Sequence, residues 1–364
     1  MIVIDGSYGE GGGQVLRTSL ALSALSGQPL RVENIRARRP KPGLQAQHLT
    51  GVLAMAQICH AEVKGAGLGS QTLIFTPRTL PQAGEYAFDV AEARKGGSAG
   101  STSLVFQTAL LPLALAGGES RLTIRGGTHV AWSPPFHYLK HVYLPTLARM
   151  GIEASVEIER WGWYPIGGGE IRAVIKGKIP DANIGDLASG IHSIDLTERG
   201  EIRRLYGFSA SSNLPSHIAE RQKRRAERFL KGHGFAPEIE IIDAPSPGQG
   251  TAVFLVAEFE NVVAGFTAYG ARGKRAEKVA EEACREFVDY YESEAALEDH
   301  LADQLILPLA WVGRGIFTTC RITQHLLTNV AVVEQFTEMS FEVEGREGER
   351  GTVRFQGRGL GVVP

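Results

Sequence analysis

The residue with the clearest chemical potential in this sequence is His325. It follows Thr323, a residue type that often caps helices, and apolar residues then recur at helical spacing from Leu326 to Val333. The sequence therefore predicts His325 in the first turn of a helix. The positive end of the helix dipole disfavours a protonated imidazole and favours a nearby phosphate, so a neutral imidazole there could act as a nucleophile. A polar residue at an element boundary without a chemical role stays an alternative.

A glycine-rich segment near the N-terminus could bind phosphate. Residues 9–14 are Gly-Glu-Gly-Gly-Gly-Gln and precede a predicted helix. Glycines let backbone N–H groups approach a phosphate at a helix N-terminus. The spacing matches neither the P-loop nor the dinucleotide-binding fingerprint, and a tight turn explains the segment as well.

Two further segments carry charges that could bind anions or a metal ion. Arg36, Arg38, Arg39 and Lys41 lie in one loop, where guanidinium groups suit phosphate oxygens and a solvated loop is the alternative. Residues 299–304 are Asp-His-Leu-Ala-Asp-Gln, and a carboxylate here could hold Mg²⁺ between nucleotide phosphates. The histidines form no zinc-binding pattern such as HExxH.

The composition excludes several classes of protein. The chain has 364 residues, 43% hydrophobic and 21% charged, which suits a globular protein with one large or two ordinary domains. No apolar run approaches the roughly 20 residues of a membrane span, and the N-terminus lacks a signal-peptide pattern. Three cysteines without metal-type spacing indicate a reducing compartment, so we expect a cytoplasmic protein. A net charge of −2 means that any contact with nucleic acid must use local basic patches.

The elements that must position these residues repeat along the chain. A strand–helix–strand–helix–strand–strand pattern over residues 1–76 recurs over residues 87–176. A third copy near the end takes in a helix at 276–294 and the helix that begins near His325. The sequence therefore predicts an α/β (α+β) fold, in which each unit has a sheet on one side and two helices on the other.

A segment that breaks this repeat lies between the second and third copies. It contains a highly charged helix at 216–231 and two strands. We expect it to form a small inserted α/β domain at 186–267, within a larger domain of residues 1–185 and 268–364 that contains the repeats. The basic face of its helix could hold nucleic acid, although a solvated helix face is the alternative.

Seven short motifs, in order along the chain, resemble those of the RNA 3′-terminal phosphate cyclase family. They are DGSYGEGGGQVLR (5–17), IRARRPKPGLQAQHLT (35–50), GSAGSTSLVFQT (97–108), GGTHVAWSPP (126–135), YPIGGGE (164–170), HLADQLILPLA (300–310) and QHLLTNVAVVEQF (324–336). The charged middle segment matches least. The resemblance implies three repeats of a four-stranded sheet backed by two helices, plus a smaller inserted α/β domain.

The resemblance also implies an activity, the ATP-dependent conversion of an RNA 3′-phosphate to a 2′,3′-cyclic phosphate. In that reaction His325 attacks the α-phosphorus of ATP, expels pyrophosphate and carries AMP. AMP then passes to the RNA 3′-phosphate, and the neighbouring 2′-hydroxyl displaces it. Such transfers rest on positioning and charge stabilisation, so we expect arginines and Mg²⁺ or Mn²⁺ at the site. The expected partners are ATP and RNA with a 3′-phosphate end, without a membrane, and the oligomeric state is left open.

Further residues receive roles from the same resemblance. The expected nucleotide-binding residues are Gln107, Pro134, His300, Leu301, Ala302, Asp303 and Gln304. The candidates for the phosphates of ATP or of the RNA end are Gln14, Arg17, Arg36, Arg39, Gln47 and His48. The expected metal ligands are Glu10 and Asp303. His300 replaces a tyrosine that some members carry, and it is also a rival nucleophile. We prefer His325 because it alone matches the family's QHLLTN-like motif.

Three other functions remain open from the sequence. Cyclase-like members of the family act in ribosome assembly without catalysis, and the presence of His325 argues against that role. An enolpyruvyl transferase would have similar repeated units but no nucleotidylated histidine. Nucleotidyl transfer to other phosphorylated ends, including DNA, is also compatible with the sequence.

Overall fold

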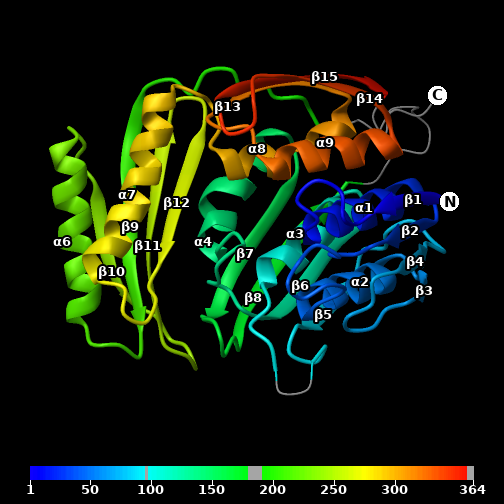
Figure 1. The fold of residues 1–364 in the computed structure, drawn as a ribbon, viewed down its shortest axis with the longest axis horizontal. Coiled ribbons are helices and arrows are strands. Elements are labelled where there is room, and N and C mark those ends of the chain that lie inside the picture. The colour runs from blue at the N-terminus through cyan, green and yellow to red at the C-terminus, as the bar shows by residue number, and fades with distance from the viewer. Residues whose placement is uncertain (95–96, 179–190, 359–364) are drawn as a thin grey trace.

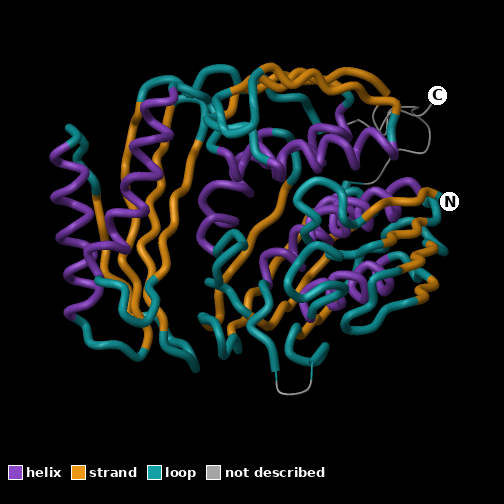
Figure 2. The backbone as a smooth tube through the Cα atoms, in the orientation of Figure 1, coloured by secondary structure: helices purple, strands orange, loops and turns teal. Residues whose placement is uncertain are grey.

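The structure, a computed structural model, describes residues 1–94, 97–178 and 191–358. Its named strands form four separate sheets, each with helices packed against it (Figures 1 and 2). The predicted α/β class, with repeated units of sheet and helices, is confirmed.

The first sheet is built by the N-terminal repeat. Its strands are β1 (Ile2–Asp5), β2 (Leu30–Glu33), β3 (Glu62–Lys64) and β4 (Leu73–Thr76). They pair in the order β1-β2-β4-β3, with β1 and β2 parallel and the other pairs antiparallel. Helix α1 (Gly13–Ser26) connects β1 to β2, and helix α2 (Ala46–Ile58) connects β2 to β3.

The second sheet repeats this topology. Its strands are β5 (Glu85–Asp89), β6 (Gly118–Gly126), β7 (Glu153–Arg160) and β8 (Gly169–Gly177), in the order β5-β6-β8-β7. Again only the first pair is parallel. The first helix is α3 (Thr102–Ala114). The second is divided into α4 (Phe136–Tyr138), a π-helical turn η1 (Leu139–Tyr143) and α5 (Leu144–Arg149).

The third repeat shares the order but has a reduced first strand. Its strands are β13 (Arg314–Thr319), β14 (Glu338–Glu344) and β15 (Gly351–Arg358), paired β13-β15-β14, and its helices are α8 (Asp299–Val312) and α9 (Gln324–Phe336). Leu196 and Leu297 form isolated parallel bridges with Phe317 and Thr319 of β13, on the edge where the first strand lies in the other repeats. Within the described residues, these two bridges take the place of that strand.

The fourth sheet belongs to the segment between these units. It consists of β9 (Ile202–Ser212), β10 (Glu238–Asp243), β11 (Gly250–Phe259) and β12 (Val263–Tyr269), in the order β10-β9-β11-β12. Helices α6 (His217–Gly232) and α7 (Ala276–Ser293) pack together and against this sheet, at the left of Figure 1.

The position of α7 corrects one expectation from the sequence. The helix at 276–294 was expected to belong to the third repeat, but the ring of Phe287 lies 5.7 Å from that of Phe266 on β12. The apolar stripe of α7 is therefore buried against the fourth sheet, and α8 takes the expected place in the third repeat. The predicted domain boundaries at 186 and 267 stay a prediction, and the first lies outside the described residues.

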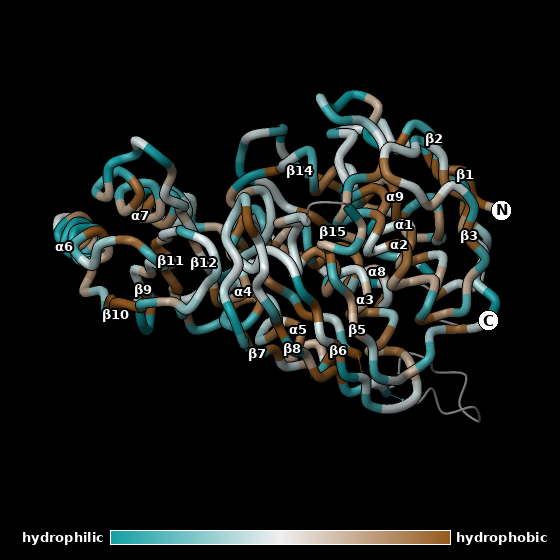
Figure 3. Tube along the Cα trace, turned by 90° about the horizontal axis from the view of Figure 1, so that it is seen from below, coloured by the Kyte–Doolittle hydropathy of each residue, from teal (hydrophilic) through white to brown (hydrophobic). Residues whose placement is uncertain are grey.

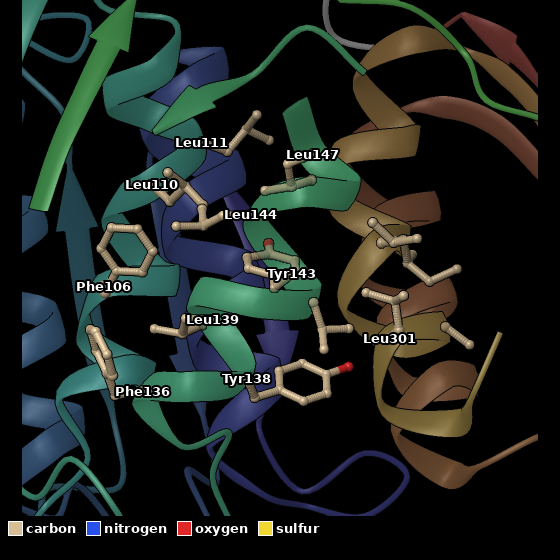
Figure 4. Packing of buried hydrophobic residues seen from close by; sticks show 14 of the residues in the cluster. Phe106, Leu110, Leu111, Phe136, Tyr138, Leu139, Tyr143, Leu144, Leu147 and Leu301 are labelled. Carbon is tan, nitrogen blue, oxygen red and sulfur yellow. The ribbon is translucent and has the colours of Figure 1, made fainter. Parts of the chain in front are cut away.

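The core of the second repeat extends to the third. Figure 4 shows Phe106 and Leu110 of α3 facing Leu139 and Leu144, with Leu301 of α8 beyond that segment. All five side chains are buried. This packing fixes the start of α8 against the second repeat. No helix in the described part of the chain is long and apolar enough to cross a membrane.

Candidate active site

The N-terminal end of α9 carries the proposed nucleophile. Oγ1 of Thr323 accepts a hydrogen bond from the backbone N–H of Leu326, 3.1 Å away, so the predicted helix cap is confirmed. His325 is the second residue of the helix, as the spacing predicted. Its side chain is 44% exposed, which leaves one edge of the imidazole open to a substrate.

Glu10 joins the glycine-rich turn to His325. One carboxylate oxygen, Oε1, forms an ion pair with Arg39, and the other, Oε2, contacts Nδ1 of His325. Both Oε2 and Nδ1 are buried and lack a hydrogen bond of ordinary geometry. A carboxylate at Nδ1 favours the tautomer with its proton on Nδ1, which leaves the lone pair on Nε2.

The pKa of His325 is lowered to about 4 by its surroundings. Burial is the largest cause, and the nearby positive charges of Arg17, His300 and Arg39 lower it further. The imidazole is therefore neutral at pH 7, as a nucleophile requires. The position at the helix N-terminus acts in the same direction.

His300, the rival nucleophile, has the opposite electrostatic setting. Desolvation lowers its pKa, but the carboxylates of Asp299, Glu298 and Asp303 together raise it above the usual value. Because the side chain is 69% exposed, water limits the desolvation and the carboxylates prevail. A raised pKa disfavours the free-base imidazole that a nucleophile needs, so the electrostatics favour His325.

The first turn of α8 is held from two sides. Glu298 caps the helix and accepts hydrogen bonds from the backbone N–H groups of His300 and Leu301, each 2.8 Å away. One turn later, Oε1 of Gln304 accepts a hydrogen bond from Nε2 of Gln107 on α3, at 2.6 Å. The predicted nucleotide-binding residues on α3 and α8 therefore lie together.

Two residues of the predicted nucleotide set belong to the hydrophobic core. Leu301 is 1% exposed and Ala302 is fully buried, so neither side chain is available to a ligand. Pro134 is half-buried in the loop before α4. That loop lies near the start of α8, because Tyr138 of α4 donates a hydrogen bond to Glu298.

A buried polar network joins α1, α8 and α9 beneath the site. Gln14 donates a hydrogen bond of 3.3 Å to Oδ1 of Asp303, and Asn329 donates one of 2.8 Å to the Asp303 carbonyl. Thr18 donates in turn to Oδ1 of Asn329, at 2.7 Å. Burial raises the pKa of Asp303 to about 7, with the positive charges of His300 and Arg17 opposing this shift. Thr18 and Asn329 were not among the residues that the sequence patterns predicted for the site.

His48 brings the first turn of α2 to the same region. Its Nδ1 accepts a hydrogen bond from the backbone N–H of Gln45 at 3.1 Å. Burial, followed by the charges of Arg17 and Arg36, lowers its pKa to about 3. A Cβ built on Gly13 would lie 2.2 Å from Nε2 of His48 and 3.0 Å from Nη1 of Arg17. Glycine at 13 therefore lets α1 start directly against both side chains.

Two candidates for phosphate binding are engaged elsewhere. Nη1 of Arg36 donates to the carbonyls of Lys41 and Gly43, at 2.6 and 3.1 Å, and so shapes its own loop. Oε1 of Gln47 accepts a hydrogen bond of 2.9 Å from the backbone N–H of Ser101. The phosphate candidates that the structure brings close to His325 and Asp303 are Gln14, Arg17, Arg39 and His48.

The residues of the site fit a divalent cation only together with a phosphate ligand. Among the described residues, no group of three His, Cys, Asp or Glu side chains could hold a metal ion. Magnesium usually takes one or two carboxylates and completes its shell with water and phosphate oxygens. Oε1 of Glu10, the carboxylate oxygen that faces Arg39 and not His325, suits such a role.

The basic helix α6 is neutralised along one side by α7. Arg221 forms a two-pronged contact with Glu277, both hydrogen bonds being 2.8 Å, and Arg225 pairs with Glu281. Figure 3 shows α6 as a hydrophilic helix at the far edge of the molecule from α9. These cations stabilise the contact between two helices, which weakens the idea that this face guides RNA.

Comparison with known proteins places the chain in a family. The family model described as RNA 3′-terminal phosphate cyclase matches residues 8–343. The RNA 3′-terminal phosphate cyclase of Methylococcus capsulatus is 48% identical over 363 residues, covering 100% of this chain and 98% of the relative. Those of Trichormus variabilis (48% identity, 92% and 94% coverage) and Pyrobaculum neutrophilum (42%, 98% and 98%) are also similar. The chain thus belongs to the RNA 3′-terminal phosphate cyclase family.

Proposed function

We propose that this enzyme forms the RNA 2′,3′-cyclic phosphate in an ATP-dependent reaction that passes through an adenylylated His325. The observation that carries the proposal is the pairing of a neutral imidazole, at the N-terminus of α9, with the Glu10 carboxylate at Nδ1. The rest of the site supplies positive charge and a nucleotide pocket around that pair.

In the first step, Nε2 of His325 attacks the α-phosphorus of ATP. A P–N bond forms, the bond to the bridging oxygen breaks, and pyrophosphate leaves. The imidazole becomes cationic as the bond forms, and Glu10 stabilises that charge through Nδ1. Arg17 and Arg39, with the helix N-terminus, stabilise the negative charge on the reacting phosphate.

In the second step, an oxygen of the RNA 3′-phosphate attacks the phosphorus of the AMP held by His325. The P–N bond breaks, and the RNA end becomes a mixed anhydride with AMP. In the third step, the 2′-hydroxyl gives up its proton to solvent and its oxygen attacks the 3′-phosphorus. The new P–O bond closes the cyclic phosphate, the anhydride P–O bond breaks, and AMP leaves with the bridging oxygen. The anhydride gives a phosphate monoester a good leaving group, which explains why ATP is consumed.

We assign the nucleotide pocket to α3, α8 and the loop before α4. Gln107 and Gln304 form one wall through their mutual hydrogen bond. Exposed His300 and half-buried Pro134 are candidates for the two faces of adenine. Leu301 and Ala302 support the pocket from the core and offer it backbone groups only.

A divalent cation, Mg²⁺ or Mn²⁺, would neutralise charge on the nucleotide phosphates. Glu10 would be its first carboxylate ligand. Asp303, which is buried and accepts a hydrogen bond from Gln14, is the second candidate. If Oε1 of Glu10 turned to a cation, Arg39 would be released from its ion pair and could bind a phosphate oxygen. We also expect a cytoplasmic protein, and its three cysteines are free thiols.

The test is incubation with α-³²P-ATP and Mg²⁺, followed by denaturing gel electrophoresis. Wild type should retain label, His325→Ala should lose it, and His300→Ala should retain it with weaker ATP binding. A label lost only in His300→Ala would move the nucleophile. A folded, ATP-binding wild type without label would instead support the non-catalytic role seen in ribosome assembly.

A further inference from the structure

A pocket of about 420 Å³ lies at the N-terminal end of α2. Its walls include residues 44–47 at the start of α2, Gly69, and two segments that carry Lys41 and Arg94. None of the described residues that line it is acidic. The pocket therefore offers hydrogen-bond donors and positive charge, a combination suited to an anion.

The two basic side chains come from separate loops. Lys41 and Arg94 are both exposed, and within the described residues neither forms an ion pair. By contrast, Arg78, Arg121 and Arg125 on the neighbouring sheets are each paired with a glutamate. Two cations left unpaired at one pocket retain their charge for a ligand.

The walls of the pocket are held by specific contacts. Arg36 fixes the loop of Lys41 by binding its carbonyl. That loop lies so close to Gly69 that a Cβ on Gly43 would meet the Gly69 carbonyl at 2.1 Å, and the φ of Gly43 is 74°. On the other side, Gln47 binds the N–H of Ser101. The pocket is thus built before any ligand arrives.

Backbone groups add to the positive potential. Ala46 and Gln47 are the first two residues of α2, and both line the pocket. The first N–H groups of a helix have no partner within it, and they lie at the positive end of its dipole. These N–H groups therefore add to the positive potential that Lys41 and Arg94 give the pocket.

The pocket adjoins the site of the reaction through one turn of helix. Gln45 and Gln47 face the pocket, while His48 in the same turn reaches Gly13 and Arg17 beside His325. When the 3′-phosphate of an RNA lies at His325, the backbone phosphates of the preceding nucleotides follow at regular intervals away from that point. We propose that this pocket binds a backbone phosphate of the RNA on the 5′ side of the reactive end. The inference rests on the proposed function for the position of the RNA end.

The experiment measures RNA binding by fluorescence anisotropy, without ATP, at several salt concentrations. The ligand is an oligonucleotide of about ten nucleotides with a 3′-phosphate, within the usual length of a single-strand site. The variant is Lys41→Ala/Arg94→Ala. The matched control is Arg272→Ala/Lys278→Ala beside the start of α7, which removes the same two types of charge from exposed positions. A second oligonucleotide carries neutral methylphosphonates at its internal linkages.

We expect the Lys41→Ala/Arg94→Ala variant to bind the charged RNA about tenfold more weakly, with a salt dependence reduced by about one phosphate contact or more. The control should bind like wild type. With the methylphosphonate RNA, wild type and variant should bind equally, because the RNA no longer carries the charge that the pocket recognises.

Two results would overturn the inference. One is an equal loss of affinity for the charged and the neutral RNA, or no loss for either. The other is a loss of His325 labelling by ATP in the absence of RNA, which would assign the pocket to the ATP phosphates. Failure of wild type to become labelled would count against the proposed function alone, since anisotropy measures RNA binding separately. Urea unfolding of both double variants checks that the fold is retained.

Discussion

The hydroxyl of Tyr138 donates a hydrogen bond to Oε1 of Glu298, a residue 160 positions later. Glu298 is 2% exposed, and burial raises its pKa to about 7. The same carboxylate caps α8 at His300 and Leu301. One buried side chain therefore couples the second repeat to the helix that carries much of the proposed nucleotide pocket.

Tyr138→Phe should destabilise the protein and weaken ATP binding. The change removes one donor from a buried carboxylate, a loss of about 1–3 kcal/mol in the free energy of unfolding. Urea unfolding and the KM for ATP in His325 labelling measure the two effects. Glu298→Gln in the Tyr138→Phe background should add less than it does in wild type, because the two side chains interact. Fully additive losses would show that the hydrogen bond does not couple them.

Much of the site could be predicted from local patterns. The Thr323 cap and the apolar spacing placed His325 correctly, because both signals lie within one helix. The repeat was visible because each copy uses the same order of strands and helices. The contact of Thr18 with Asn329 was not visible, since it joins helices 311 positions apart and depends on how α1 packs against α9.

The packing partner of α7 and the contacts of the loop arginines also depend on the three-dimensional arrangement. An apolar stripe predicts that a helix is buried, but not against which sheet, so α7 was assigned to the wrong repeat. Arginine in a loop is as suited to backbone carbonyls as to phosphates. Only the fold shows that Arg36 holds its own loop while Arg39 faces Glu10.

Glu10→Gln should slow His325 labelling by about 100-fold, within the range of a lost charge stabiliser at a reacting group. The amide keeps the shape of the side chain but removes the negative charge that faces Nδ1 of His325 and Nη2 of Arg39. Single-turnover labelling with saturating ATP measures the chemical step. Glu240→Gln, an exposed change on β10 of the fourth sheet, is a control expected to label normally. A normal rate for Glu10→Gln would remove Glu10 from the mechanism.

The stability of the contact between the second repeat and the fourth sheet should fall in acid. His129 stacks on Trp161 at 3.9 Å, and its Nε2 lies 2.9 Å from Nδ1 of His137, whose ring packs on Phe208 of β9. Burial lowers the pKa of His129 well below its usual value and that of His137 to about 3. Both rings are therefore neutral in the folded protein at pH 7.

Acid should destabilise the fold because the unfolded chain takes up more protons than the folded protein. Between pH 6.5, the ordinary pKa of histidine, and about pH 3, these histidines are protonated in the unfolded chain but stay neutral in the folded protein. The free energy of unfolding should therefore decrease as the pH is lowered through this window, by up to about 1.4 kcal/mol per pH unit for each histidine. His137→Phe should flatten this dependence in urea titrations, whereas His217→Gln on exposed α6 should not. Unchanged pH dependence in His137→Phe would exclude this pair as its origin.

Gly9→Ala should disrupt the turn that presents Glu10. Gly9 has a φ of 57°, and a Cβ there would lie 2.2 Å from Oγ1 of Thr328 on α9. The left-handed backbone alone costs roughly 1 kcal/mol for alanine, and the clash adds to it. Thr328→Ala should relieve the clash but not the backbone strain. We therefore expect Gly9→Ala to lower both the urea midpoint and the rate of His325 labelling, and Gly9→Ala/Thr328→Ala to recover part of each. If the double variant were no better than Gly9→Ala, the close approach between the turn and α9 would not limit the position of Glu10.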